Sequence, residues 1–330
     1  MTKKILFIID DIELKYFEFN DLVTNFWFIK EFLKRNYIVD IAIKCDLFIE
    51  NAKAYVLSRK STLKDENIFY EKNQNKHLVN DYDVVFFRPD PPVDINYINA
   101  CYAFDYVDRE KTLLINDPNE VKNFNEKFHI NYFPNHAPKN IITSNTELIM
   151  EFVEKEKEAI LKPLNRCFGS GVYYMNREDK NLLTIIKNMT EEGKTPVMVQ
   201  KYLPEAKYGD KRVLIIGETV MEECIQKLPA EHNFKFSIHN DKYFKSTKLS
   251  ENERIMAQEI ASTLSKNGIY LIGLDVIEEK VIEINITSPC YFIREINQHF
   301  GIHFEDKIMA CFEEMIKKHF SKERTYAVKR

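Results

Sequence analysis

The first third of the chain alternates short apolar runs with an amphipathic segment. Apolar runs at Lys4–Ile9, Tyr37–Ile43, Tyr82–Phe87 and Thr112–Asn116 are bounded by polar residues and predict buried strands. Between the first two, Phe19–Asn36 repeats its apolar residues with the period of a helix. Strands that alternate with helices predict an α/β fold, in which a mostly parallel sheet carries helices on its faces.

From about residue 120 the order of the elements changes, and strands begin to follow one another. A short helix is predicted at Asn125–Phe133, and Ser250–Gly268 reads as a helix with a capping box between Ser250 and Glu253. A last helix is expected at Glu305–His319, followed by a frayed tail. The predicted strands of this part are Glu158–Leu164, Thr195–Pro204 and Asp210–Gly217.

The segment DVIEEKVIEINITSP, Asp275–Pro289, predicts a β-hairpin with an interrupted apolar pattern. Glu283 and Asn285 are two residues apart and therefore share one face of their strand. Asp275 joins that face if it pairs with Glu283, which requires a turn of odd length such as Glu278–Lys280. The three side chains are either a solvent-facing row or oxygen ligands that converge on Mg²⁺.

The loop Arg88–Asp94 follows a predicted strand directly and contains three prolines. In parallel α/β sheets, ligands bind beyond the carboxyl ends of the strands. The loop is therefore either a rigid turn or a support that holds Arg88 and Asp90 for an anionic or zwitterionic substrate.

Two lysines and a glycine-containing loop are candidates for phosphate binding. Lys162 ends an otherwise apolar strand and precedes the loop Asn165–Val172, which holds Gly169 and Gly171. Backbone amides of such a loop can surround phosphate oxygens. Lys127, on a separate element, is the second candidate. The alternative for Lys162 is a side chain that extends outward into solvent.

Composition narrows the functional classes. The 330 residues are 45% hydrophobic and 30% charged, with a net charge of −4, which allows two or three domains and gives no basic excess for nucleic acid. No apolar run approaches the roughly 18 residues of a membrane span, and the apolar run after the N-terminus is too short for a signal peptide. Six isolated cysteines suggest reduced thiols and a cytoplasmic protein. The chain has 8 glycines, whereas an average composition would give roughly 23. Motifs that need glycine are therefore hard to recognise in this sequence.

Eight collinear segments together resemble the prokaryotic-type glutathione synthetases of the ATP-grasp superfamily, over nearly the whole chain. The segments are RPDPPVD (Arg88–Asp94), NEK (Asn125–Lys127), ILKPL (Ile160–Leu164), QKYLP (Gln200–Pro204), GDKRVLII (Gly209–Ile216), IGLDVI (Ile272–Ile277), EINITSP (Glu283–Pro289) and IREI (Ile293–Ile296).

This resemblance implies a Rossmann-like N-terminal domain and an ATP-grasp domain with a mobile lid. The expected bounds are 1–122 for the substrate-binding domain, 123–205 for the central or lid part, 206–320 for the metal-binding part and 321–330 for the tail. It also implies a carboxylate–amine ligase that works through an acyl phosphate on small-molecule substrates, most specifically γ-glutamylcysteine and glycine. A homo-oligomer is a further candidate property.

The resemblance also implies a role for each matching residue. Arg212 would contact the reacting phosphate and carboxylate and Arg294 the acyl substrate, and both are the candidate catalytic residues. The nucleotide-binding set would be Lys127, Lys162, Gly169, Gln200, Lys201, Tyr202, Leu203 and Asp210. The substrate-binding set would be Arg88, Asp90, Ser288 and Arg294. The ligands of Mg²⁺, with Mn²⁺ as an alternative, would be Asp275, Glu283 and Asn285.

The sequence departs from the family pattern mainly in its loops. Arg166 and Phe168 stand where glycine is expected in the phosphate loop, and Ala230–Lys248 lacks the glycines of the later loop. In that later loop, Lys235, His239 and Lys242 are candidate anion contacts. Proline stands where lysine is common in RPDPP, and SPCYFIREI is one residue longer than usual.

These departures leave three alternatives open beside glutathione synthesis. The same ligase chemistry can serve a different acyl donor or amine, the protein can be a nucleotide-binding pseudoenzyme with a regulatory role, or it can be a kinase that stops at phosphorylation.

Overall fold

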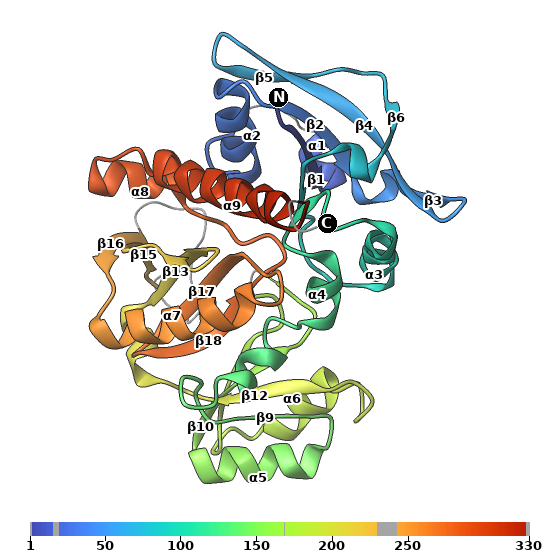
Figure 1. The fold of residues 1–330 in the computed structure, drawn as a ribbon. Helices are drawn as coiled ribbons and strands as arrows, with labels where there is room; N and C mark the ends of the chain where they lie inside the picture. The colour runs from blue at the N-terminus through green and yellow to red at the C-terminus, as the bar shows by residue number, and fades with distance from the viewer. Residues whose placement is uncertain (1, 16–19, 168, 230–242, 328–330) are drawn as a thin grey trace.

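The computed structural model describes residues 2–15, 20–167, 169–229 and 243–327, with side chains up to residue 321. An N-terminal sheet, a small central sheet and a C-terminal sheet follow one another along the chain (Figure 1). Among the described residues, no helix is both long and apolar enough to cross a membrane.

The N-terminal sheet has the order β3-β4-β2-β1-β7-β8. The four strands from β2 to β8 in this order are parallel, as the sequence predicted, and their runs of Ile, Val and Phe are almost fully buried. These strands are β1 (Lys4–Ile9), β2 (Ile38–Ile43), β7 (Val84–Phe87) and β8 (Leu113–Ile115). The helices of this region are α1 (Asp11–Lys15), α2 (Thr24–Lys34), α3 (Ile95–Tyr102) and α4 (Pro118–Asn123).

An antiparallel extension of this sheet was not predicted. The long strand β4 alternates buried and exposed residues along its first half, which is the period of a half-buried strand. Its apolar positions are separated by Lys, Ser and Arg, so it lacks the continuous apolar runs of the parallel strands. The extension consists of β3 (Leu47–Glu50), β4 (Lys53–Lys64), β5 (Asn67–Tyr70) and β6 (Asn75–Leu78).

The central sheet has the order β11-β10-β12-β9 and a hydrophobic core of its own, in which Ile149, Val153, Leu161 and Ile186 are fully buried. The expected role of this part as a lid stays a prediction. The elements are β9 (Asn140–Thr143), α5 (Thr146–Glu156), β10 (Glu158–Pro163), β11 (Tyr173–Asn176), α6 (Leu182–Met189) and β12 (Val197–Lys201). The short helix predicted at Asn125–Phe133 is a 3₁₀ turn at Phe128–Tyr132.

The C-terminal sheet has the order β16-β15-β13-β17-β18, with β14 paired to β13. The predicted capping box begins α7, because Ser250 and Glu253 each accept a hydrogen bond from the other's backbone amide. The elements are β13 (Asp210–Ile216), β14 (Thr219–Val220), β15 (Glu223–Lys227), β16 (Phe244–Lys248), α7 (Glu251–Ser265), β17 (Leu271–Ile277), β18 (Lys280–Asn285), α8 (Ile293–Phe300) and α9 (Phe304–Ala327).

Helix α9 joins the N-terminal and C-terminal sheets into one core (Figure 1). The ring of Phe312 lies 5.1 Å from that of Phe28 on α2 and 5.1 Å from that of Phe86 on β7. The sequence analysis ended this helix near His319, but it continues to Ala327, and no glycine or proline interrupts it.

The β17–β18 hairpin pairs Asp275 with Glu283, as expected, but by a different turn. The turn contains only Glu278 and Glu279, both with positive φ. The register then shifts between Asp275 and Val276, where Ile282 of β18 is an extra, bulged residue in place of the odd residue that was assigned to the turn. Hence the carboxylates of Asp275 and Glu283 share a face although the turn itself has even length.

Candidate active site

A cavity of about 630 Å³ lies between the N-terminal sheet and the C-terminal sheet. A volume of this size is typical of a small-molecule site. Residues from all three sheets or their adjoining loops border it. Of the residues expected from the sequence, it is bordered by Arg88, Asp90, Lys162, Gly169, Asp210, Arg212, Asp275, Glu283, Asn285 and Ser288.

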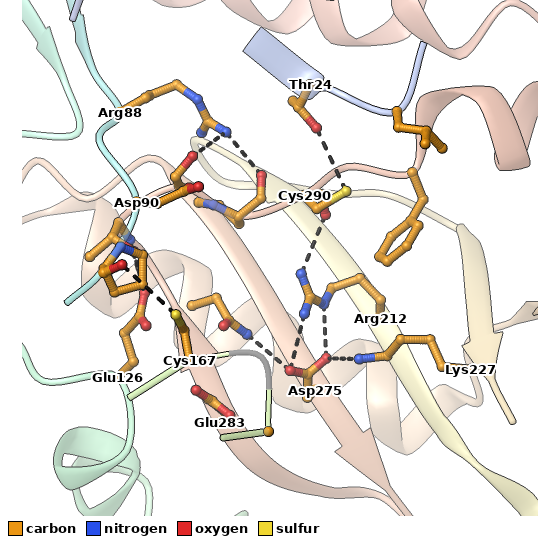
Figure 2. A pocket seen from close by; sticks show the side chains of 18 of the residues that line it. Thr24, Arg88, Asp90, Glu126, Cys167, Arg212, Lys227, Asp275, Glu283 and Cys290 are labelled. Carbon is orange, nitrogen blue, oxygen red and sulfur yellow. Dashed lines mark hydrogen bonds and ion pairs between the residues drawn. The ribbon is translucent and has the colours of Figure 1, made fainter. Parts of the chain in front are cut away.

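Asp275 lies at the centre of the strongest polar cluster (Figure 2). Arg212 donates to both of its carboxylate oxygens, at 2.8 and 3.1 Å, and Lys227 donates at 2.9 Å. Asn285 Nδ2 donates to Asp275 Oδ2 at 3.1 Å. Gly273 makes room for this arrangement, since a Cβ there would lie 3.2 Å from Arg212 Nη1.

Two neighbouring cations determine the charge of Asp275. Burial alone would raise the pKa of Asp275, but Arg212 and Lys227 outweigh it and hold that pKa well below its usual range. Lys227 also forms an ion pair with Asp210 at 2.7 Å. Asp275 is therefore an anion that two buried cations stabilise at neutral pH.

A second ion pair joins the central region to the hairpin. Lys127 Nζ donates to Glu283 Oε1 and to the carbonyl oxygen of Arg166, each at 2.8 Å. Lys127 itself is buried and does not border the cavity, whereas Glu283 does. The lysine thus connects the loop Asn165–Val172, the candidate phosphate-binding loop, to the hairpin strand.

Lys162 points inward and does not extend into solvent. Its ammonium donates to Gln200 Oε1 at 2.9 Å and to the carbonyl oxygen of Ile282 at 3.4 Å. Burial lowers its pKa to about 8, although Glu283 opposes the shift. Burial destabilises the charged form of this ammonium, and an anionic ligand such as phosphate would stabilise it.

The donor set of the hairpin fits Mg²⁺. Asp275, Glu283 and Asn285 place carboxylate and amide oxygens on one face of paired strands, and hard oxygen atoms are the ligands that Mg²⁺ takes. In the structure the carboxylates bind Arg212, Lys227 and Lys127. The assignment of these three residues as metal ligands stays a prediction.

A buried side-chain donor on Gln200 favours its expected place in a nucleotide site. Its side chain is 2% exposed, and its Nε2 has no hydrogen-bond partner among the described residues. A buried donor without a partner favours a ligand that accepts a hydrogen bond there.

Three further residues expected in the nucleotide site do not border the cavity, and neither does Gln200. Lys201 forms an ion pair with Glu156 at 3.3 Å, and the Tyr202 ring contacts Tyr174 edge to face. Leu203 precedes a 3₁₀ turn. Their expected role rests on backbone groups near Tyr202 and Leu203, and it stays a prediction.

Arg88 forms the opposite end of the cavity (Figure 2). Its Nη2 donates to the carbonyl oxygen of Pro289 at 3.0 Å and to Ser288 Oγ at 3.3 Å, and its Nε donates to Asn25. The guanidinium is 5.5 Å from the ring centre of Phe28. These contacts hold the Arg88 side chain against α2 and the segment that follows the hairpin.

Arg294 is the one residue of the expected substrate-binding set that lies away from the cavity. Its guanidinium donates to Glu295 at 2.7 Å and lies 3.6 Å from Asp21. The candidate anion contacts Lys235, His239 and Lys242, and Phe168 of the phosphate loop, lie outside the described residues.

Two charged residues beside the hairpin were missed by the sequence analysis. Lys227 ends a strand that packs beside β13, and only strand pairing shows that it reaches Asp275. Glu126, within the NEK segment, accepts hydrogen bonds from the backbone of Ile286 and Thr287 and borders the cavity. Its position between Asn125 and Lys127, in a segment that matches the family, could have indicated that it belongs to the site.

Comparison with known proteins identifies the family. The family model "Prokaryotic glutathione synthetase, N-terminal domain" matches residues 4–122, and "Prokaryotic glutathione synthetase, ATP-grasp domain" matches residues 126–301. The glutathione synthetase of Vibrio parahaemolyticus is 32% identical over 296 residues, which cover 89% of this chain and 93% of that protein. The glutathione synthetase of Buchnera aphidicola is 33% identical, with 89% and 92% covered.

Solved structures agree on the fold. D-alanyl-alanine synthetase A from Vibrio cholerae has a TM-score of 0.59 at 12% identity and covers 96% of this chain and 100% of its own. The ATP-grasp ligase PsnB, solved with a precursor variant, Mg and ADP, has a TM-score of 0.58 at 14% identity and covers 97% and 99%. At these identities the likeness concerns the ATP-grasp fold alone. The family models and the curated relatives show that the chain belongs to the prokaryotic glutathione synthetase family and is an ATP-dependent, amide-forming ligase.

Proposed function

We propose that this protein is a glutathione synthase, which joins γ-glutamylcysteine to glycine and converts ATP to ADP and phosphate. The observation that carries the proposal is the cluster of Arg212, Lys227 and Asp275 beside Glu283 on the wall of a cavity. The identity of 32–33% to curated glutathione synthetases over most of the chain supports this choice of substrates.

The reaction needs charge neutralisation and alignment. The carboxylate of the acyl donor attacks the γ-phosphate of ATP, ADP leaves, and the amine then displaces phosphate from the acyl phosphate. Arg212 and Lys162 lie where they can balance the negative charges of the phosphate and the attacking carboxylate. Arg88 at the far end is placed to bind an anionic part of the donor, with Ser288 beside it.

Asp275, Glu283 and Asn285 would hold Mg²⁺, or Mn²⁺ in its place. When bound, the divalent ion neutralises phosphate oxygens and orients them for transfer. Lys127 and Arg212 hold the carboxylates of Glu283 and Asp275 in position.

A second candidate is the same ligase chemistry on another donor or acceptor, favoured by Pro89 at a position where this family commonly has lysine. One assay separates the two: ADP release with ATP and Mg²⁺ over a panel of γ-glutamyl, aspartyl and alanyl donors, each paired with glycine, serine or alanine. Release that depends on γ-glutamylcysteine and glycine together supports glutathione synthesis. Release with a different pair would overturn it.

The metal assignment has its own test. E283Q keeps the size of the side chain but removes its charge, so it should abolish ADP release while circular dichroism shows an intact fold. An E283Q enzyme with wild-type activity would contradict the assignment of Glu283.

We further propose a cytoplasmic enzyme that forms a homo-oligomer. The free, scattered cysteines support a reducing compartment. Analytical ultracentrifugation would test the oligomeric state, and a monomer over the working concentration range would contradict it.

A further inference from the structure

An acidic group that no assignment above uses lies beside Arg88 at the far end of the cavity. Glu13, on α1, borders the cavity together with Asn25, Arg88 and Asp90. The sequence analysis did not select Glu13, because nothing in its local pattern distinguishes it from a surface residue.

One amide side chain connects the acid to the arginine. Asn25 Nδ2 donates to both Glu13 oxygens, at 2.9 and 3.2 Å, while Asn25 Oδ1 accepts from Arg88 Nε. Asn25 is 2% exposed and therefore fixed. A carboxylate and a guanidinium are thus held on either side of a single amide without forming an ion pair with each other.

Arg88 can donate a further hydrogen bond to a ligand. The residue is 2% exposed, and its Nη1 has no hydrogen-bond partner among the described residues. A buried guanidinium nitrogen without a partner favours an anionic or carbonyl oxygen from a ligand.

The surroundings of Glu13 also favour a cation. Its pKa is raised to about 7: burial is the largest cause, Asp90 and Asp10 add to it, and the amide of Asn25 and Arg88 oppose it. Lys44 lies 3.7 Å from Asp10 and balances that acid only in part. A positively charged ligand group would relieve the repulsion among these carboxylates.

We propose that Glu13 binds the α-ammonium group of the acyl donor while Arg88 Nη1 binds its α-carboxylate. The pair would recognise the free amino-acid head of a γ-glutamyl compound, at the end of the cavity away from Lys162. Glu13 is then a specificity residue for the donor. This inference rests on the proposed function, because it assumes a γ-glutamyl donor.

The test compares two donors that differ in one group. N-glutarylcysteine is γ-glutamylcysteine without its α-amino group and keeps both carboxylates. Wild-type enzyme should have a KM about tenfold or more higher for N-glutarylcysteine, because a charge-assisted hydrogen bond is lost. E13Q should raise the KM for γ-glutamylcysteine about as much, yet change the KM for N-glutarylcysteine less than about twofold.

D11N is the matched control, because Asp11 is exposed on the same helix, loses the same charge and does not border the cavity. It should leave both KM values unchanged. Turnover of N-glutarylcysteine by E13Q demonstrates that the variant is folded.

Two results would overturn the inference: an equal loss on both donors in E13Q, which indicates a structural role, or no loss on either. Failure of the proposed function gives a different result: wild-type enzyme would then release no ADP with γ-glutamylcysteine and glycine. In that case this inference would be wrong as well.

Discussion

Arg212 and Asp275 lie opposite each other on β13 and β17 and are joined by two parallel hydrogen bonds, Nε to Oδ1 at 2.8 Å and Nη2 to Oδ2 at 3.1 Å. Both side chains are buried, and Lys227 completes the charge balance. A carboxylate proposed to bind a metal is therefore also part of the protein's internal packing.

The first prediction concerns this buried pair. D275N should abolish ADP release and lower the free energy of unfolding by about 3 kcal/mol, because Arg212 and Lys227 lose the anion that compensates their burial. Denaturation in urea measures the change. E50Q removes the partner of exposed Lys76 and should lower it by less than about 1 kcal/mol. A D275N protein as stable as E50Q would contradict the argument.

The second prediction concerns pH and Lys162. Its pKa is about 8 in the free protein, and a bound phosphate would keep the ammonium protonated to higher pH. Affinity for ADP should therefore fall as the pH rises above 8, by up to about tenfold per pH unit, until the pKa of the ammonium in the complex is reached. Isothermal titration calorimetry at several pH values measures this.

The lysines provide a matched comparison for this pH effect. K162Q should bind ADP more weakly and lose the decline above pH 8. K127Q should bind more weakly but keep it, because the interaction with Glu283 raises the pKa of Lys127 above its ordinary value despite burial. An unchanged profile in K162Q would assign the titration to another group.

The third prediction concerns Asn116, which connects β8 to the C-terminal sheet. Its Nδ2 donates to the carbonyl oxygens of Leu271 and Ile286, each at 2.8 Å, and its Oδ1 accepts from the backbone amides of Tyr270 and Leu271. N116A should lower the free energy of unfolding by about 3 kcal/mol, since buried backbone groups lose their partners. N119A, at a position with a less buried side chain, is the control; equal stability of both variants would contradict the role of Asn116.

The fourth prediction concerns the hairpin turn. Glu278 has a φ of +49°, which asparagine tolerates better than glutamate, and it lies near Glu205, whose proximity raises the pKa of Glu278. E278N should raise the melting temperature by a few degrees without changing ADP release. E279N is a useful contrast, because Glu279 accepts hydrogen bonds from Ser250 and Asn252 that this change would weaken. A lower melting temperature for E278N would contradict the argument from the turn.

Local sequence was sufficient for the elements that depend on near neighbours. The parallel strands β1, β2, β7 and β8 were predictable because strands buried on both faces have continuous apolar runs. The start of α7 was predictable because Ser250 and Glu253 are three residues apart. The strand β4 was missed, since its alternation is diluted by polar residues on a half-exposed face.

In the candidate site, too, some features follow from local sequence and others only from the tertiary structure. The sequence determined that Glu283 and Asn285 share a face, and the order of motifs determined the family. Only the tertiary structure decided that a bulge brings Asp275 opposite Glu283, that Lys227 from β15 reaches Asp275, and that Asn25 holds Glu13 beside Arg88. The physical reason is that periodicity fixes the direction of a side chain from its own strand or helix, whereas partners far apart in the chain are fixed by strand pairing and packing.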